Sequence, residues 1–222
     1  CRDFACRAPL TEPSGIAEAL SQHAAEEASA GRTLSARRLP SAATAEGTAS
    51  YAVRSGSAGK PHGYGPMGTT GLTCSRTGFG GYRVDDETPA HREALRKALL
   101  EGSNLVDTST NYTDGGSERL VGEVLAELAG SGRLPREEVV VVSKIGYVQG
   151  ENLDRALERE ASGRPFPEMV KYAEGVWHCI HPEFLEDQLA RSLDRLGLET
   201  VDVCLLHNPE YYVSDAHERS HG

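Results

Sequence analysis

Short apolar runs alternate with helical patterns from residue 64 onward, and this alternation constrains the fold of the chain more than any other feature. The clearest runs are four to six residues long and occupy residues 104–107, 139–142 and 201–206. Apolar runs of this length, separated by helical patterns, are typical of buried strands in a parallel sheet. The chain is therefore expected to fold as repeated β-α units.

Three helices are expected, one before each of these strands. Thr88 followed by Pro89 is typical of an N-cap and a first helical position. Ser117 is expected to cap the second helix, and the third begins at His181. Glycine marks the opposite end of each helix, at Gly102, Gly130 and Gly197. The inward-facing residues are expected to be Ala90, Ala94, Leu95, Ala98 and Leu99, then Leu120, Val121, Val124, Leu125 and Leu128, then Leu185, Leu189, Leu193 and Leu196.

Residues 1–63 differ in composition from the rest of the chain. They are rich in Ala, Ser, Gly, Arg and Thr and contain few large apolar residues, although residues 17–30 could form a short helix. Such a segment buries too little surface to offset the entropy of ordering it. We therefore expect a disordered low-complexity tail over 1–63 and a folded domain over 64–222.

Two further segments of the domain carry weaker patterns. Residues 68–75 indicate a small hairpin, and residues 77–82 indicate a first strand with its exit loop. Residues 147–180 show no clear period and are interpreted as a long insertion of the kind that forms lids or substrate walls. Tyr172 and Trp177 are the candidates for such a wall.

Composition excludes several classes of partner. The formal net charge is −10 and no basic stripe is present, which disfavours nucleic acids and anionic membranes. No apolar segment approaches 18 residues, so no membrane span is expected. The five cysteines form no CxxC pair and are odd in number, which favours a reducing, cytoplasmic location; Cys204 is expected to be buried. His178 and His181 lack a second pair of ligands, so no metal is expected.

The β-α repeats are compatible with two architectures. Right-handed crossovers fold such units into either a doubly wound sheet or a segment of a barrel. No GxGxxG motif follows the first strand, which weakens the dinucleotide-binding, doubly wound interpretation. The residues alone leave both architectures open.

Ionisable residues follow the apolar runs and form the candidate site. Asp107 ends one run, Tyr112 lies in the loop after it, Lys144 follows the next run and His207 follows the last. Parallel α/β folds place their chemistry at the carboxyl ends of strands. We therefore expect these four side chains to meet at one edge of the sheet.

The four residue types together suit proton transfer to a carbonyl oxygen. A free phenol is a poor acid at neutral pH, but a cation within roughly 4 Å stabilises a phenolate by about 4 kcal/mol, or about three pKa units. Lys144 is the candidate cation and Asp107 would hold it charged and oriented. Tyr112 would then act as general acid, with His207 donating a hydrogen bond to the substrate oxygen or sharing in the proton relay. The hydride must come from a cofactor.

These motifs, in this order, resemble the aldo-keto reductase family over about residues 67–210. The matching residues are Thr70-Gly71-Leu72 with Ser75, Gly80-Gly81-Tyr82, Asp107-Thr108 with Tyr112, Gly116-Ser117-Glu118, Ser143-Lys144, and Leu193, Leu196-Gly197, Asp202 and Leu206-His207. The resemblance implies a TIM (β/α)8-type barrel, NADP(H) and reduction of an aldehyde or ketone. It also implies Tyr112 as proton donor, completed by Asp107, Lys144 and His207, and places Gly81, Tyr82 and Asp107 beside the nicotinamide.

The chain departs from this pattern in two ways. The segment 147–180 lengthens the gap between Lys144 and His207, and the sequence stops soon after the fourth strand, whereas a full barrel needs about 250 residues. We expect a barrel truncated to about its first four β-α units, as an amino-terminal fragment, an aberrant product or a gene model cut short. Its open edges favour self-association.

Two functions follow from these observations. The first is an NADP(H)-dependent oxidoreductase that acts on a small-molecule carbonyl substrate. The alternative is a catalytically inactive truncated fragment or a non-catalytic binding protein of the same family.

Overall fold

The computed structural model describes residues 38–55 and 63–221. Its strands are β1 (Tyr64–Pro66), β2 (Thr73–Ser75), β3 (Phe79–Gly80), β4 (Leu105–Asp107), β5 (Val140–Ile145), β6 (Tyr147–Val148), β7 (Val170–Ala173), β8 (Val176–His178) and β9 (Val203–Leu206). Its helices are α2 (Ala45–Arg54), α3 (Pro89–Leu100), α4 (Gly116–Gly130), α5 (Glu151–Ala161), α6 (Pro182–Leu196) and α7 (Glu210–His221), with 3₁₀ turns η1 (Tyr112–Gly115) and η2 (Arg136–Glu138).

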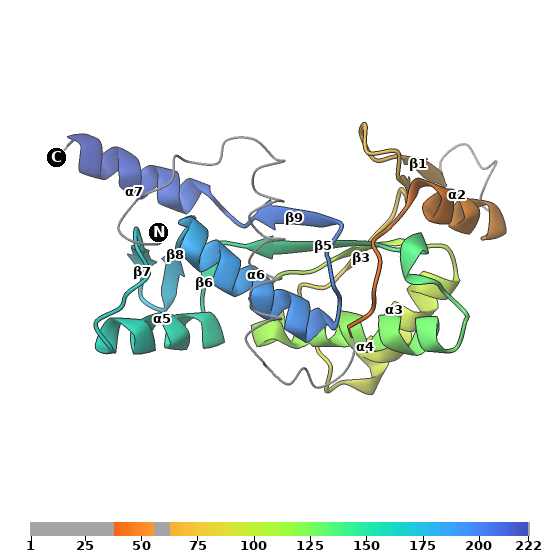
Figure 1. Ribbon diagram of the computed structural model, residues 1–222, viewed down its shortest axis with the longest axis horizontal. Coiled ribbons are helices and arrows are strands. Elements are labelled where there is room, and N and C mark those ends of the chain that lie inside the picture. The colour runs from red at the N-terminus through yellow and green to blue at the C-terminus, as the bar shows by residue number, and fades with distance from the viewer. Residues whose placement is uncertain (1–37, 56–62, 222) are drawn as a thin grey trace. The chain divides into compact units, whose positions relative to one another are not determined.

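Four strands form a parallel sheet in the order β3-β4-β5-β9 (Figure 1). Gly80 pairs with Asp107, Asp107 with Val142, and Lys144 with Leu205. The predicted α/β fold with a parallel sheet is therefore confirmed. Strand order follows chain order without the reversal that defines a doubly wound sheet. Within the described residues the sheet is open, with β3 and β9 at its edges.

Helices α3, α4 and α6 lie on the same side of these strands in the view of Figure 1. The predicted inward face of α4 is confirmed, because all five of its apolar residues are buried. The buried cluster between the helices and the sheet consists of Tyr51, Leu95, Leu99, Val106, Leu120, Val121, Val124, Leu125, Leu128, Leu134, Val139, Val141, Leu196 and Leu198. This cluster packs the helices against the two central strands, through Val106 of β4 and Val141 of β5.

A glycine sets the distance between α4 and α6. A Cβ atom added at Gly122 would lie 2.3 Å from the carbonyl oxygen of Leu196. We expect Gly122→Ala to lower the free energy of unfolding by about 1–3 kcal/mol, because overpacking outweighs the roughly 1 kcal/mol that alanine gains in a helix. Urea denaturation measures the change. Gly130→Ala is the matched control, since nothing lies within 4 Å of its added Cβ; a Gly122→Ala variant as stable as this control would contradict the close packing.

The predicted inward faces of α3 and α6 are partly wrong. On α3 Leu95 and Leu99 are buried, but Ala90 and Ala94 are exposed. On α6 the buried positions are Phe184, Gln188, Ser192 and Leu196, while Leu185, Leu189 and Leu193 are half-buried. The apolar pattern misplaced this face because a polar residue, Gln188, is buried there with both ends of its amide hydrogen-bonded. Its Oε1 accepts from the Gly146 backbone at 2.6 Å and its Nε2 donates to the Tyr147 carbonyl at 2.9 Å.

The prediction of a disordered tail over 1–63 is wrong for residues 38–55. Thr44 caps α2 by accepting a hydrogen bond from the Gly47 backbone at 2.9 Å. Tyr51 is buried and its hydroxyl donates to the Leu99 carbonyl at 2.5 Å. These partners lie far along the chain, so the helix is stabilised by tertiary contacts that composition does not reveal. The helix expected at 17–30 lies outside the described residues.

The segment 147–180 is folded rather than irregular. Strands β6, β8 and β7 form an antiparallel sheet in that order, and α5 lies beside them (Figure 1). Phe166 packs edge-on against Phe184 of α6 with ring centroids 5.1 Å apart, and Cys179 is buried in the same cluster. The lack of a clear sequence period in this segment therefore does not reflect a lack of regular structure. A hairpin is present as the antiparallel pair β1-β2, but it begins at Tyr64, before the range 68–75 in which it was expected.

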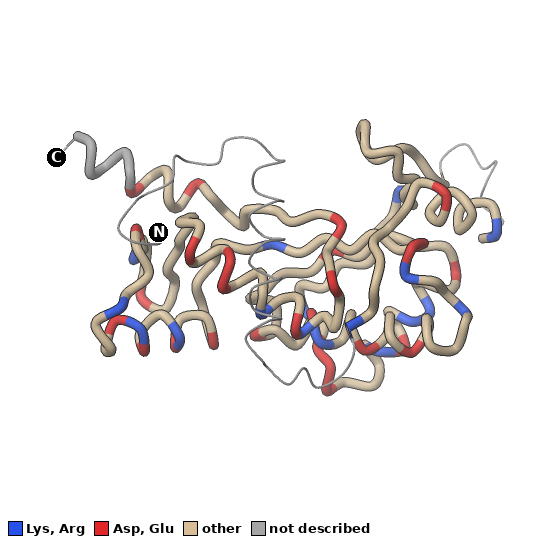
Figure 2. Tube along the Cα trace, viewed as in Figure 1, with Lys and Arg blue, Asp and Glu red and all other residues tan. Residues whose placement is uncertain are grey.

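The last strand of the sheet is exposed. Leu205 and Leu206 are 43% and 45% exposed, and Cys204 is exposed rather than buried as expected. The reason is that β9 is an edge strand, with β5 as its neighbour on one side only. Across the described ranges, acidic and basic residues are interspersed (Figure 2), and no helix there is long and apolar enough to cross a membrane.

Candidate active site

Lys144 connects three groups at the carboxyl edge of the sheet. Its Nζ donates to Asp107 Oδ1 at 2.5 Å, to the Tyr112 hydroxyl at 3.0 Å and to the Thr108 carbonyl at 2.9 Å. An ammonium group has three hydrogens, and these contacts use all of them. The side chain of Lys144 is only 14% exposed, so the charge is fixed in one place and largely shielded from water.

His207 completes the group of four. It follows β9, and its ring centroid lies 5.7 Å from that of Tyr112 in an edge-on arrangement. Burial, and secondarily the Lys144 ammonium, lower the pKa of His207 to about 4. The His207 carbonyl accepts a hydrogen bond from His178 Nε2 at 2.7 Å, which fixes the backbone at this position. All four predicted side chains therefore meet at one edge of the sheet.

The depressed pKa of His207 makes stability depend on pH. An unfolded histidine takes up a proton near pH 6.5, whereas His207 in the fold does so near pH 4, so acid favours the unfolded chain between these values. We expect His207 to lower the free energy of unfolding by about 2 kcal/mol as pH falls from 6.5 to 4, after allowance for solvent at a half-buried group. Urea denaturation across this range should show a shallower pH dependence in His207→Gln. Parallel curves for the two proteins would rule out the shift.

The turn after Tyr112 is strained. Thr113, Asp114 and Gly115 have φ angles of 47°, 53° and 80°, a left-handed conformation that costs a non-glycine residue about 1–3 kcal/mol. Two hydrogen bonds hold it: Thr113 Oγ1 donates to the Val84 carbonyl at 2.7 Å, and Asp114 Oδ1 accepts from the Glu151 backbone at 2.9 Å. The turn redirects the chain directly from the site into α4.

Gly115, not Ser117, is the N-cap of α4, so that prediction is wrong. Ser117 lies in the first turn and its Oγ is 2.8 Å from Thr108 Oγ1, with both residues fully buried. Its neighbour Glu118 is also fully buried; it accepts from Ser143 Oγ at 2.6 Å and from Arg195 Nε at 2.7 Å. This carboxylate therefore ties α4 and α6 to β5, one residue before Lys144.

The structure brings the Gly81–Tyr82 loop beside the four residues. The Gly81 N–H donates to the Asp107 carbonyl at 2.8 Å, and a Cβ there would lie 2.3 Å from Ser117 Oγ, so only glycine fits. The Tyr82 ring is 63% exposed and lies edge-on to Tyr112 with centroids 5.3 Å apart.

Two residues of the site escaped the sequence analysis. Ser109 Oγ lies 2.9 Å from His207 Nδ1, and the Tyr147 ring lies 5.2 Å from the His207 ring. The only sequence signal for Ser109 is its place in the loop between Asp107 and Tyr112. Tyr147 had no signal, because β6 is only two residues long. Of the two residues suggested as a substrate wall, Tyr172 stacks on Tyr211 at 4.2 Å and Trp177 contacts Lys171 at 4.2 Å.

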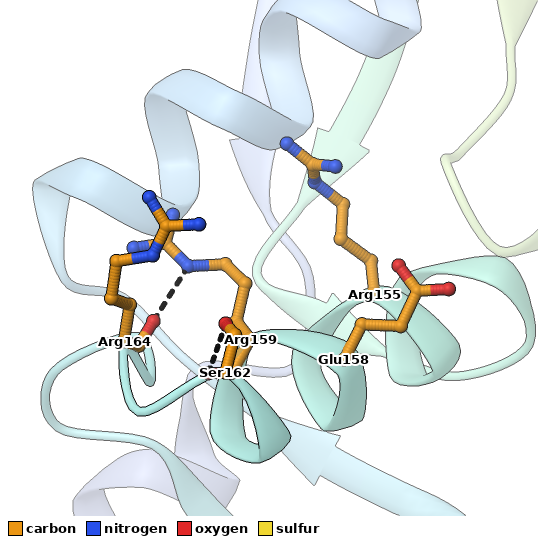
Figure 3. Close-up of a pocket in the computed structure, with 5 residues that line it drawn as sticks. All are labelled: Arg155, Glu158, Arg159, Ser162 and Arg164. Carbon is orange, nitrogen blue, oxygen red and sulfur yellow. Dashed lines mark hydrogen bonds between the residues drawn. The ribbon is translucent and has the colours of Figure 1, made fainter.

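A separate hollow of about 420 Å³ lies along α5 and the loop that follows it (Figure 3). It is lined by Arg155, Glu158, Arg159, Ser162 and Arg164. Arg155 forms ion pairs with Asp187, and Arg159 pairs with Glu183, both on α6. These arginines therefore serve to fasten α5 to α6, and none of the lining residues belongs to the group of four.

The fold and the site define a class of protein. It is an α/β protein in which a lysine at the carboxyl edge of a parallel sheet contacts both a tyrosine and a carboxylate, and a neutral histidine lies beside them. The profile of the aldo/keto reductase family matches residues 76–218, and the chain belongs to this family.

The chain is similar to individual curated proteins and to a solved structure. Over 153 residues the chain is 29% identical to the NADH-specific methylglyoxal reductase of Escherichia coli (strain K12), a match that covers 64% of this chain and 40% of the relative. It is 32% identical over 141 residues to an NADPH-dependent D-xylose reductase of Meyerozyma guilliermondii, with 63% and 33% covered. An aldo-keto reductase structure from Bacillus halodurans (holo form) aligns with a TM-score of 0.48 at 24% identity, covering 71% of this chain and 46% of that one. The chain thus spans 33–40% of the length of these two curated relatives.

Proposed function

We propose that this chain carries the proton-transfer site of an NADP(H)-dependent oxidoreductase that reduces an aldehyde or ketone, with Tyr112 as general acid. The observation that carries the proposal is the Lys144 ammonium, 3.0 Å from the Tyr112 oxygen and 2.5 Å from Asp107. The alternative uses of a lysine at a strand end, a solvated charge or a surface ion pair, do not explain a 14% exposed ammonium aimed at a phenol.

Each residue has a distinct role in this reaction. Tyr112 gives its proton to the carbonyl oxygen as negative charge develops there, a contribution of typically 10²–10⁴ in rate. Lys144 stabilises the negative charge left on the Tyr112 oxygen. Asp107 and the Thr108 carbonyl accept hydrogen bonds from the Lys144 ammonium and fix its direction. His207 lies beside Tyr112 and would donate a hydrogen bond to the substrate oxygen or share in the proton relay.

The surface beside Tyr112 suits the nicotinamide end of a cofactor. Nothing lies within 4 Å of a Cβ placed at Gly80, the Tyr82 ring is exposed, and the Asp107 side chain is 43% exposed. Gly81, Tyr82 and Asp107 would hold the group, which when bound supplies the hydride. The names of the two relatives differ, one NADH-specific and one NADPH-dependent, so the preference for NADP(H) is part of the proposal.

We also propose that the four parallel strands are the first half of a (β/α)8 barrel. Their consecutive order and the helices between them are those of barrel winding. The exposed Leu205 and Leu206 on β9 suit burial against a further strand. A second copy of the chain meeting this edge would give self-association, which analytical ultracentrifugation at rising concentration detects.

The proposed setting is the cytoplasm, with a small carbonyl compound as substrate and neither nucleic acid nor membrane as partner. The cysteines in the described ranges, Cys74, Cys179 and Cys204, are free, as in a reducing compartment. A non-catalytic binding role is the second candidate, and the exposed β9 edge favours it because such an edge is a template for pairing.

A direct assay separates these functions. The purified chain is titrated with NADPH and with NADH by fluorescence, and oxidation of each is then followed with a panel of aldehydes. We expect saturable NADPH binding and aldehyde-dependent NADPH oxidation. Binding of neither cofactor and turnover of no aldehyde would reject the enzymatic proposal for this polypeptide and leave the binding role.

A further inference from the structure

A serine lies among the arginines of the hollow along α5. Arg155, Arg159 and Ser162 are spaced by four and three residues, which places them on one face of the helix. Arg164 follows in the loop, and all four residues line the hollow. Figure 3 shows the three arginine side chains extending toward α6. One hydroxyl group therefore shares the hollow with three guanidinium groups.

The arginines keep most of their N–H groups free. Arg155 contacts Asp187 through Nε and Nη2. Arg159 uses Nε on the Arg164 carbonyl and Nη2 on Glu183. An arginine has five N–H groups, so three remain on each of these two. The Arg164 guanidinium makes no hydrogen bond or ion pair with any other residue that the structure describes, and it keeps all five.

Positive charge exceeds negative charge around the hollow. Its lining contains three arginines and one carboxylate, that of Glu158. Of the two carboxylates on α6 that pair with the lining arginines, Asp187 is shared with a further arginine of α6. The Arg159 guanidinium is also fixed in place, because it lies over the buried Phe166 ring, 3.9 Å from its centroid. Such a site suits a phosphoryl group, whose oxygens accept the paired N–H groups of arginine.

We propose that Ser162 is a phosphorylation site and that the hollow binds the phosphoryl group which this serine then carries. A protein kinase transfers the γ-phosphoryl group of a nucleoside triphosphate. The bond from Ser162 Oγ to phosphorus forms, the bond from phosphorus to the β-phosphate oxygen breaks, and the hydroxyl proton goes to the catalytic base of the kinase. Ser162 is exposed to such an enzyme, and Arg159 precedes it by three residues, a charge pattern of the kind that kinases select.

A covalently attached phosphoryl group suits this hollow better than a free phosphate ion. The hollow is open to water, since Arg155, Ser162 and Arg164 are exposed. Exposed ion pairs contribute only about two- to fivefold each to an equilibrium constant. Attachment to Ser162 holds the group beside the arginines at an effective concentration in the millimolar range. The carboxyl end of a helix disfavours a negative charge by about two- to fivefold, and three arginines together outweigh that penalty.

The chain contains a matched control for this site. Ser131 ends α4 as Ser162 ends α5, and each serine is followed by a left-handed glycine and an arginine. Each hydroxyl donates to the carbonyl three residues earlier, at 3.1 Å and 3.0 Å. Ser131 lacks the two arginines on the helix, because apolar residues, Val124 and Leu128, occupy the corresponding positions. Comparison of the two serines therefore isolates the effect of those arginines.

Phosphorus NMR tests the binding of the phosphoryl group. Two full-length variants, Ser162→phosphoserine and Ser131→phosphoserine, are made by insertion of phosphoserine during translation, and their ³¹P shifts are followed from pH 5 to 8. Phosphoserine ordinarily loses its second proton near pH 6. We expect the pKa at position 162 to lie about one unit below that at position 131, because the arginines favour the dianion.

Arg164→Ala in the Ser162→phosphoserine chain tests the role of the arginines. It removes a side chain without a partner among the described residues, so the fold is expected to persist. We expect the pKa of the phosphoryl group to rise by about half of the one-unit difference. Equal pKa values at positions 162 and 131, or no change in Arg164→Ala, would overturn the proposal.

Two further measurements test the source of the phosphoryl group. The full chain is incubated with ATP and a serine kinase that selects arginine three residues before the serine, and mass spectrometry locates the phosphate. We expect phosphate on Ser162 and none on Ser131; an unmodified Ser162 would overturn its assignment as a phosphorylation site. Inorganic phosphate is titrated into the unmodified chain while the arginine side-chain ¹H–¹⁵N signals are followed. We expect no saturation below about 10 mM, and saturation below that concentration would assign the hollow to a free phosphate and overturn the role of Ser162.

Discussion

Replacement of Tyr112 by phenylalanine should lower aldehyde-dependent NADPH oxidation by 10²–10⁴-fold, the usual contribution of a general acid. The change removes only the hydroxyl that Lys144 contacts at 3.0 Å, and it leaves the ring and its edge-on contacts with Tyr82 and His207 in place. Steady-state rates measured at saturating NADPH give the effect on kcat. NADPH affinity should change little, since Tyr112 acts on the reacting oxygen.

Tyr64→Phe is the matched control for this experiment. It removes a tyrosine hydroxyl of the β1 hairpin that donates to the Gly102 carbonyl at 2.6 Å, far along the chain from the four site residues. We expect it to cost about 1 kcal/mol of stability and to leave kcat unchanged. If Tyr112→Phe were as active as Tyr64→Phe, Tyr112 would not be the proton donor.

The largest effect on stability is expected from Asp202→Ala. The side chains of Asp202 and Arg136 are 2% and 3% exposed and form an ion pair at 2.8 Å. The same carboxylate accepts from the backbone of Ala43 at 2.6 Å and of Val141 at 2.7 Å, so it joins the segment before α2 to the sheet. Its removal leaves the buried Arg136 without a counter-ion, with only the Val139 and Thr200 carbonyls as hydrogen-bond acceptors, which costs about 3–5 kcal/mol. Urea denaturation monitored by circular dichroism measures this loss.

Asp194→Ala provides the comparison. Asp194 also pairs with an arginine, Arg38, but its side chain is 57% exposed. Exposed ion pairs contribute about 0–1 kcal/mol. Similar losses in the two variants would show that the buried pair of Asp202 and Arg136 contributes no more to stability than the exposed pair does.

The parallel sheet and the four site residues could be predicted because both depend on local pattern. Apolar runs predicted the strands β4, β5 and β9. Because parallel strands share one carboxyl edge, Asp107, Lys144 and His207 were then expected to lie close together. The roles of these residues in the reaction remain proposals, but predicting that they lie close together required only the positions of the strands.

Features that depend on distant partners could not be predicted. Helix α2 is held by Tyr51 against Leu99 and by Arg54 against Glu138, and neither contact leaves a trace in the composition of residues 38–55. The strands β6, β7 and β8 are two to four residues long, too short for an alternating pattern. Gln188 is polar but buried because its amide is hydrogen-bonded to the backbone of Gly146 and of Tyr147 in β6.

The left-handed turn that follows Tyr112 also bears on attempts to make the protein more heat-resistant. Thr113 and Asp114 are exposed, so glycine at either position would relax the backbone without disturbing a packed interior. A screen for variants with a higher melting temperature would be expected to select glycine at these two positions in its first rounds. The variants obtained would also lose the side chains that hold the turn to Val84 and Glu151, and the phenol would then point in a less definite direction.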